Sequence, residues 1–146
     1  MDNPVMDHVS ACVEKALSDA RRDLKIVATS AEDIVISTGR MFPDGDPVHL
    51  RIWPLLSGPS TIVVSDGGLT YSRIGENDKT SPDLALSVRY DMLRYLPVQD
   101  IAGQVVVYAK SPDLAEAISI VADCCLFLDT AILVASHLRP QARSSS

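Results

Sequence analysis

Three aspartates in glycine-containing turns are the residues of this sequence whose types and spacing could support chemistry. Asp44 and Asp46 belong to the run Pro-Asp-Gly-Asp, and Asp66 directly precedes Gly67-Gly68. Carboxylates from neighbouring turns can converge on Mg²⁺, and a nearby lysine can then polarise the attacking water or the phosphate. This pattern raises the hypothesis of a metal-dependent nuclease.

The lysine that such a nuclease requires is missing. Pro43-Asp44 resembles the proline–acidic pair of restriction-endonuclease-like folds, in which an acidic-x-Lys motif follows on the next strand, but this sequence has His49-Leu50-Arg51 there. Aspartate and glycine are also the residues that tight turns select. We therefore interpret the aspartates as turn residues and predict no catalytic residue, metal site or cofactor. Carboxylates about 4–6 Å apart around a cation would favour the nuclease, whereas carboxylates that cap their own turns would exclude it.

The other candidate nucleophiles and ligands form no recognisable catalytic pattern. They are spread along the chain as His8, His49, His137, Cys12, Cys124 and Cys125. The cysteines form no CxxC motif and no Cys/His zinc spacing, and no GxSxG motif occurs. Gly67-Gly68 has no accompanying lysine and no predicted helix after it, so we do not expect a phosphate-binding loop. The cysteines are interpreted as reduced, buried thiols of a cytoplasmic protein.

Arg51 and Trp53 are the predicted contact residues. They alternate with the apolar residues of one strand and therefore lie on its opposite face. Tryptophan and arginine are enriched at the energetic centres of protein interfaces. Because tryptophan is also highly buried on average, a helix that covers this face is an equally weighted alternative. Asp44, Asp46 and Asp66 complete the predicted binding set.

Composition excludes several classes of function. The chain has 146 residues, a formal net charge of −6 and 47% hydrophobic residues, as expected for one globular domain. Its basic residues are scattered, so we predict no nucleic-acid binding. The acidic N-terminus lacks the apolar region of a signal peptide. Residues 117–135 are long enough to span a membrane, but Asp123 and Asp129 would each cost roughly 3 kcal/mol at the bilayer centre, so we predict no membrane partner.

The hydrophobic pattern predicts an α+β domain over residues 6–138 and a flexible C-terminal tail over residues 139–146. We expect an antiparallel sheet of four to five strands with an N-terminal helix, a middle helix and a long C-terminal helix, the helices lying on one face. The expected helices are 6–23, 82–95 and 112–138, and the expected strands are 24–29, 33–38, 48–54, 61–64 and 104–110, with 69–74 as a further short strand. Ser-Pro-Asp-Leu occurs at 81–84 and 111–114, where serine is the expected N-cap of each helix.

The last predicted helix is more apolar than an outer helix of a monomer requires. Its polar residues recur every seven positions at Glu116, Asp123, Thr130 and His137, and most of the remaining circumference is apolar. Either this helix is sandwiched within the fold or it packs against a second chain. We predict a homodimer through this helix. The expected interface residues are Ile118, Cys125, Leu128 and Ile132.

The residues around the turns resemble a known family. The run from Ile36 through Met41-Phe42-Pro43-Asp44-Gly45-Asp46 is followed by an alternating strand and then by Val64-Ser65-Asp66-Gly67-Gly68-Leu69-Thr70. This order resembles, over roughly residues 6–135, the bacterial and phage family called domain of unknown function 1828. Two departures stand out: Gly67 replaces the second acidic residue of the turn, and Arg40-Met41-Phe42-Pro43 replaces Thr-Pro-Phe.

The resemblance implies a fold more than an activity. Members of the family occur among phage and mobile-element genes, which implies a role in host–phage conflict. Together with the missing catalytic set, this predicts a non-enzymatic protein-interaction module, such as a phage or mobile-element accessory protein with an anti-defence role. The alternatives are a degenerate metal-dependent nuclease and a small-ligand binder with its pocket at a dimer seam.

Overall fold

The computed structural model describes residues 4–19, 24–55, 61–76 and 81–138. A six-stranded antiparallel sheet has the strand order β1-β2-β3-β4-β6-β5. The strands are β1 (Lys25–Thr29), β2 (Ile34–Met41), β3 (Pro47–Pro54), β4 (Thr61–Ser65), β5 (Gln99–Ile101) and β6 (Gln104–Lys110). The helices are α1 (Pro4–Asp19), α2 (Leu69–Glu76), α3 (Pro82–Leu93), a 3-10 turn at Ser111–Asp113 and α4 (Leu114–Leu138).

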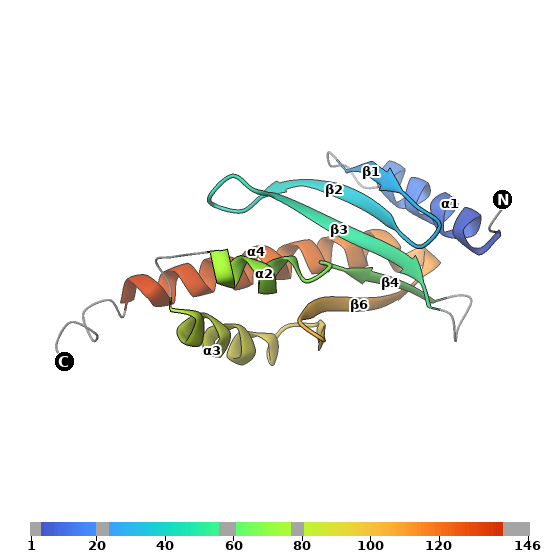
Figure 1. Cartoon of the computed structure of the whole chain (residues 1–146). Helices are drawn as coiled ribbons and strands as arrows, with labels where there is room; N and C mark the ends of the chain where they lie inside the picture. Colours follow the sequence, from blue (N-terminus) through green and yellow to red (C-terminus); the bar gives the residue numbers. More distant parts are fainter. Residues whose placement is uncertain (1–3, 20–23, 56–60, 77–80, 139–146) are drawn as a thin grey trace.

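The predicted α+β architecture is confirmed, with one strand more than the upper expectation. Figure 1 shows α1 and α4 on one side of the sheet, with α2 and α3 beside the C-terminal half of α4. The extra strand, β5, is short and joins β6 through Ala102 and Gly103, which both have positive φ. That conformation suits a two-residue hairpin turn. The expected tail over 139–146, the end of the expected first helix and the turn at 57–60 lie outside the described residues.

Alternation along the strands divides the sheet into a core face and an outer face. The core face is formed by aliphatic residues that are fully or nearly fully buried: Ile34, Ile36, Val48, Leu50, Ile52, Ile62, Val64 and Val105. The residues between them point to the opposite face, because side chains alternate along a strand. The register aligns Trp53 with Val63, and Val63 with Tyr108, so that these three residues form one row across β3, β4 and β6.

Helix α4 is the core helix of the domain. By length and composition it could cross a membrane, but it packs along the sheet and buries the side chains of Leu114, Ile118, Val121, Cys125, Leu128 and Ile132. The expected interface residues Ile118, Cys125, Leu128 and Ile132 therefore face the interior of their own chain, with at most 8% exposure. That expectation is wrong because the apolar residues opposite the polar stripe pack on the sheet and on α3.

The three thiols lie in this core as free cysteines. Burial raises the pKa of Cys124, and burial with the nearby Asp66 carboxylate raises the pKa of Cys125 well above its ordinary value. Because the thiolate is the reactive form, both should be inert in the folded protein. We expect Ellman's reagent to label fewer than one of the three thiols within minutes in the native protein, and all three after unfolding. Labelling of native Cys124 or Cys125 at the rate of free cysteine would contradict this packing.

Of the two helix starts predicted from Ser-Pro-Asp-Leu, one is confirmed and the other is wrong. Ser81 caps α3 as predicted, since its hydroxyl accepts the backbone N–H of Leu84 at 3.4 Å. Ser111 does not cap α4, because its hydroxyl contacts the Cys12 Sγ at 3.0 Å and the chain forms a 3-10 turn before the helix begins. The expected strand over 69–74 is also wrong, since these residues lie in α2.

Candidate functional site

The acidic turn between β2 and β3 pairs with an arginine from α2. Asp44 caps its own turn, because its Oδ1 accepts the backbone N–H of Asp46 at 3.1 Å. Its other oxygen lies 3.0 Å from a terminal nitrogen of Arg73, and Asp46 pairs with the same guanidinium at 2.9 Å. The backbone N–H of Asp46 and then Arg73 lower the pKa of Asp44 below its ordinary value.

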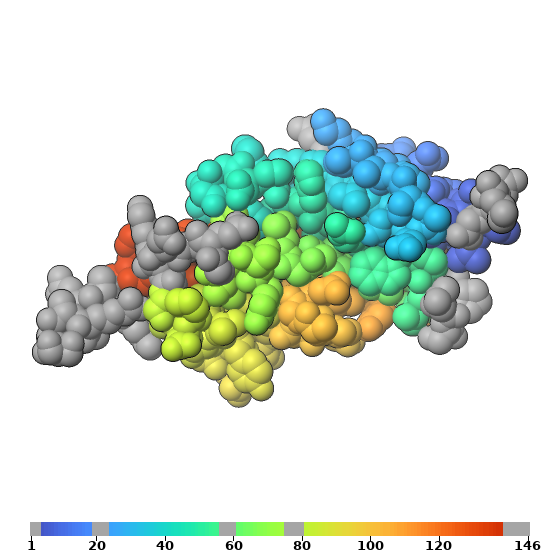
Figure 2. Space-filling model, in the orientation of Figure 1, coloured from blue at the N-terminus to red at the C-terminus, as the bar shows by residue number. Residues whose placement is uncertain are grey.

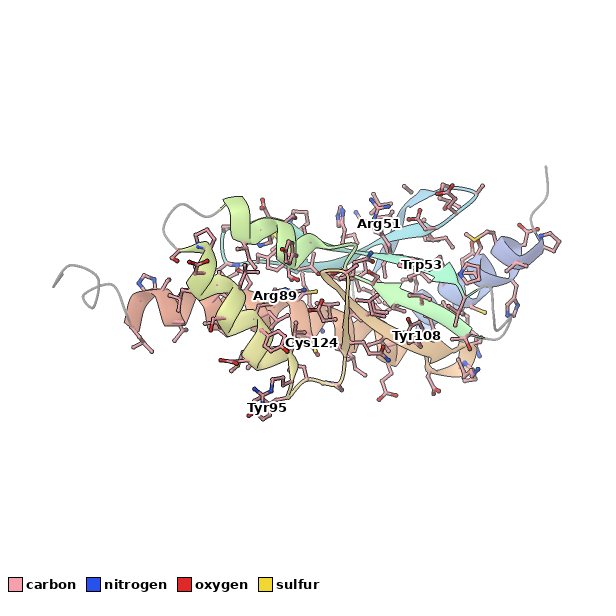
Figure 3. The ribbon with its side chains drawn as sticks, turned by 60° about the horizontal axis from the view of Figure 1, so that its bottom comes forward. Arg51, Trp53, Arg89, Tyr95, Tyr108 and Cys124 are labelled. Carbon is pink, nitrogen blue, oxygen red and sulfur yellow. The ribbon has the colours of Figure 1, made fainter. Side chains whose placement is uncertain are left out.

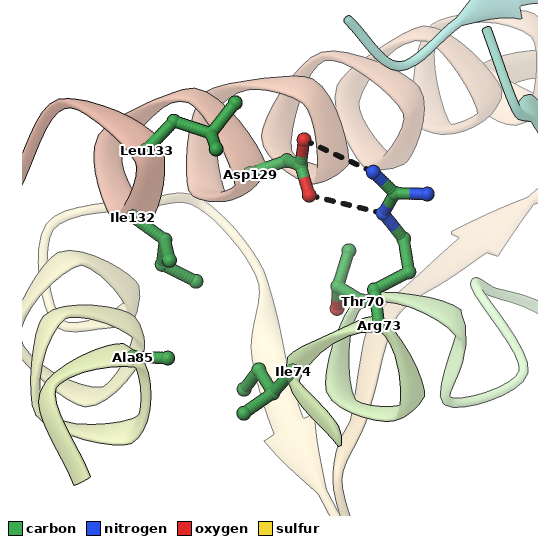
Figure 4. A pocket seen from close by; sticks show the side chains of 7 residues that line it. All are labelled: Thr70, Arg73, Ile74, Ala85, Asp129, Ile132 and Leu133. Carbon is green, nitrogen blue, oxygen red and sulfur yellow. Dashed lines mark hydrogen bonds and ion pairs between the residues drawn. The ribbon is translucent and has the colours of Figure 1, made fainter. Parts of the chain in front are cut away.

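Arg73 of α2 links this turn to α4 through its ion pairs. Its Nε donates to Asp129 of α4 at 3.0 Å, as Figure 4 shows, and its guanidinium stacks 3.9 Å from the centroid of the Phe42 ring. Burial lowers the pKa of Arg73, but the hydrogen bonds that it donates to Asp129 and Asp44 outweigh burial and raise its pKa. The cavity beside this pair has a volume of about 20 Å³, which is room for one water and too small for a ligand.

Asp66 caps α2. Its Oδ1 accepts the backbone N–H groups of Gly68 and Val105, each at 2.9 Å, and its Oδ2 accepts the backbone N–H and the hydroxyl of Thr70. Our expectation that no helix follows Gly67-Gly68 is therefore wrong, because α2 begins at Leu69. The anion that the start of α2 attracts is the chain's own Asp66 carboxylate, so the turn still offers no phosphate site.

These three carboxylates fit the turn interpretation and not the nuclease alternative. Asp44 caps its own turn, Asp46 pairs with Arg73, and the buried Asp66 caps α2. Among residues 4–19, 24–55, 61–76 and 81–138, no group of three or more His, Cys, Asp or Glu side chains could hold a metal ion. Each of the three carboxylates is therefore engaged by groups of its own chain.

A buried polar chain extends from Asp66 towards the surface. The hydroxyl of Thr70 links Asp66 to Arg89 of α3, whose guanidinium donates to the carbonyl of Gly103 at 3.0 Å and pairs with Asp100 at 3.4 Å. Arg89 is 3% exposed, and its Nε has no partner within the described residues. These contacts tie α2, α3 and the β5–β6 hairpin together. Sequence analysis missed Arg73 and Arg89, since nothing in the local pattern marks an arginine whose partners are far away in the chain.

The outer face of the sheet brings together the predicted contact residues. Figure 3 shows Arg51, Trp53 and Tyr108 on the strands, and Tyr95 at the far end of α3. Trp53 is half-buried and Tyr108 is 41% exposed, and Val63 lies between them in the same row, 3% exposed. This face therefore combines two aromatic side chains with buried aliphatic side chains between them, to which Val106 also belongs.

Arg51 borders a hollow at one end of this face. It pairs with Asp33 at 2.9 Å, and its side chain lies across Gly67, where a Cβ would come within 3.0 Å of the Arg51 Cδ. The hollow is open and has a volume of about 400 Å³. Its lining residues are Glu32, Asp33, Arg51, Trp53, Gly67 and Gln104. Figure 2 shows that β3 (teal) and the β5–β6 region (orange) both reach the surface on this side of the molecule.

The structure therefore separates the predicted binding set. Arg51 and Trp53 share an accessible face, Asp44 and Asp46 lie at a hairpin tip paired with Arg73, and Asp66 is buried. We define the outer face as Arg51, Trp53, Val63, Val106 and Tyr108. No family model, curated protein or solved structure matches the chain.

Proposed function

We propose that this chain is a non-enzymatic protein-interaction module that binds its partner through the outer face. The observation that carries the proposal is the row Trp53–Val63–Tyr108, in which a half-buried tryptophan and an exposed tyrosine flank a buried valine. Aromatic and arginine side chains around a dry centre are the composition of interface hot spots. The carboxylates and arginines that could have formed a catalytic site instead form helix or turn caps and ion pairs.

The shape and charge of the outer face favour a protein over a small molecule. The hollow beside Arg51 is open, whereas ligand pockets enclose most of the ligand surface. Glu32 and Asp33 border it, and the chain carries a net charge of −6. We therefore propose a partner that presents an aliphatic or aromatic side chain to the row and a basic side chain to Glu32, since complementary charge steers association.

The resemblance to the domain of unknown function 1828 family adds a class of partner to this proposal. A phage or mobile-element accessory protein with an anti-defence role would bind a component of its host. We propose the cytoplasm as the compartment, because the three cysteines are free thiols.

An affinity capture from host lysate tests the proposal with matched tyrosine and tryptophan variants. We expect Trp53→Ala and Tyr108→Ala to weaken capture of a stoichiometric partner by about thirtyfold each, because hot-spot truncations cost about 2 kcal/mol or more. Tyr95→Ala should retain capture, since Tyr95 is 77% exposed and lies away from the outer face.

Two results would contradict binding through the outer face. Capture that survives both outer-face variants while their far-ultraviolet circular dichroism stays native would contradict it. Loss of capture by Tyr95→Ala alone would move the interface to the end of α3.

A further inference from the structure

The outward side of α4 carries an apolar seam that stays exposed within the described part of the chain. Phe127 is 49% exposed, Val134 is 51% exposed and Leu138 is 79% exposed. Ile120 and Ala131 are half-buried on the same side. These five residues, which we call the α4 seam, follow one another at steps of seven, four, three and four residues. That spacing is the pattern by which one helix packs along another.

The chain leaves much of the α4 seam uncovered, although Ile120 packs partly against the core. Only 44% of the most apolar 18-residue window of the helix is buried, although the window could pass as a membrane span by composition. Single exposed apolar residues are ordinary, but a row of them along one side of a helix marks a contact surface. This surface lies on α4 and not on the outer face of the sheet, so it is independent of the proposed function.

We propose that the α4 seam binds the α4 seam of a second copy of this chain, with the two helices antiparallel about a two-fold axis near Thr130. A closed two-fold contact requires a surface that is complementary to itself. The polar stripe of α4 (Asp123, Thr130 and His137) provides this complementarity, because it flanks one side of the seam at equal seven-residue steps.

The geometry of a two-fold axis selects the antiparallel arrangement. An axis perpendicular to two antiparallel helices brings the same flank of each helix together. Asp123, 63% exposed, then lies opposite His137 of the second copy, and Thr130 lies opposite its own counterpart. Asp123 pairs with Arg40 of its own chain and is still 63% exposed, so His137 of the second copy becomes a further polar partner of this carboxylate in this register.

The apolar residues fit the same register. With Thr130 at the axis, Phe127 falls between Ala131 and Val134 of the second copy, and the small Ala131 lets the two helices approach closely. In a parallel arrangement, the polar stripe would instead face the opposite flank of the seam. That flank is formed by Val121 and Leu128, which are fully buried in their own core and offer no surface.

Sedimentation velocity from micromolar to about 0.5 mM protein tests the association. We expect a reversible dimer whose dissociation constant rises at least about tenfold in Phe127→Glu, because a charge at the centre of the seam must be desolvated. Tyr95→Glu places the same charge on another exposed aromatic position and should leave the dimer intact. A monomer throughout this range, or a dimer unaffected by Phe127→Glu, overturns the proposal.

Cysteine cross-linking tests the direction of the helices on an otherwise native chain. The three natural thiols are buried, so a new surface cysteine is the reactive one. Thr130→Cys should form an intermolecular disulfide under mild oxidation, and Tyr95→Cys should not. A dimer in which Thr130→Cys fails to cross-link overturns the antiparallel register. If monomers instead bind neutral liposomes through the α4 seam, the proposal that a second copy covers the seam is overturned.

Discussion

Replacing Asp66 with alanine should lower the free energy of unfolding by about 3–5 kcal/mol, since several donors would be left without an acceptor and each buried one costs about 1–3 kcal/mol. Asp66 is 4% exposed and accepts hydrogen bonds from Gly68, Thr70 and Val105. A loss of this size is a large part of the stability of an ordinary domain. Urea unfolding, followed by the fluorescence of the single tryptophan and by circular dichroism, measures it.

Two further variants control this measurement. Asp66→Asn keeps the size of the side chain and one acceptor oxygen, so it should lose less than alanine does. Asp83→Ala removes an exposed carboxylate from the first turn of α3 and should change the free energy of unfolding by no more than about 1 kcal/mol. Unchanged or greater stability in Asp66→Ala would contradict the capping role, because that is the behaviour of a carboxylate retained for activity.

Replacing Arg73 with methionine should lower the free energy of unfolding by about 3 kcal/mol at neutral pH. The methionine retains an apolar contact with Phe42 but leaves Asp129, whose side chain is 15% exposed, without its cation. Asp44 and Asp46 would then add two uncompensated negative charges nearby. Thermal or urea unfolding of the variant beside the natural protein gives the difference directly.

The pH dependence of that difference has a definite sign. The pKa of Asp44 lies below its ordinary value of 3.8 in the folded protein, so its stabilisation is present above that value and is lost as the pH falls through the folded pKa. The difference in the free energy of unfolding between the natural protein and Arg73→Met should therefore narrow below about pH 4. Asp44→Asn, which removes one exposed carboxylate, should destabilise the protein much less than Arg73→Met does. A gap that widens in acid would contradict the ion-pair account.

The strands were predictable from the sequence because alternation along them reflects one buried face. Val48, Leu50 and Ile52 place Arg51 and Trp53 on the opposite side of β3, as the structure does. Tyr108 could not be added to the same face beforehand, because its row depends on the register between β4 and β6. A register is a long-range property that no local pattern specifies.

The segment after Asp66 shows how a distant contact overrides a local pattern. Residues 69–74 alternate weakly and resemble a strand, but the Asp66 carboxylate caps them into α2, and Ile74 packs against Ala85 and Ile132. Strand β5 was missed for a different reason, since its three residues are all exposed and carry no hydrophobic pattern. The two buried arginines were missed because their partners come from other parts of the chain.

For α4, the sequence does not show which apolar residues belong to the core and which to an interface. A seven-residue polar stripe tells which side faces out, yet the apolar residues beyond it can be either core or interface. The structure assigns Ile118, Cys125, Leu128 and Ile132 to the core. The exposed apolar residues lie beside the stripe, at Phe127 and Val134, where composition alone gives no reason to separate them from the core set.

Site-specific photo-cross-linking in host cells tests the proposed binding face most directly. A benzoylphenylalanine residue at Tyr108 reports on the outer face, and the same residue at Tyr95 is a matched control at another exposed tyrosine. We predict one discrete cross-linked protein from position 108 that is absent from position 95 and is lost when Trp53→Ala is added. Equal cross-linking from both positions, or a product at position 108 that persists in Trp53→Ala, would contradict partner binding through the outer face.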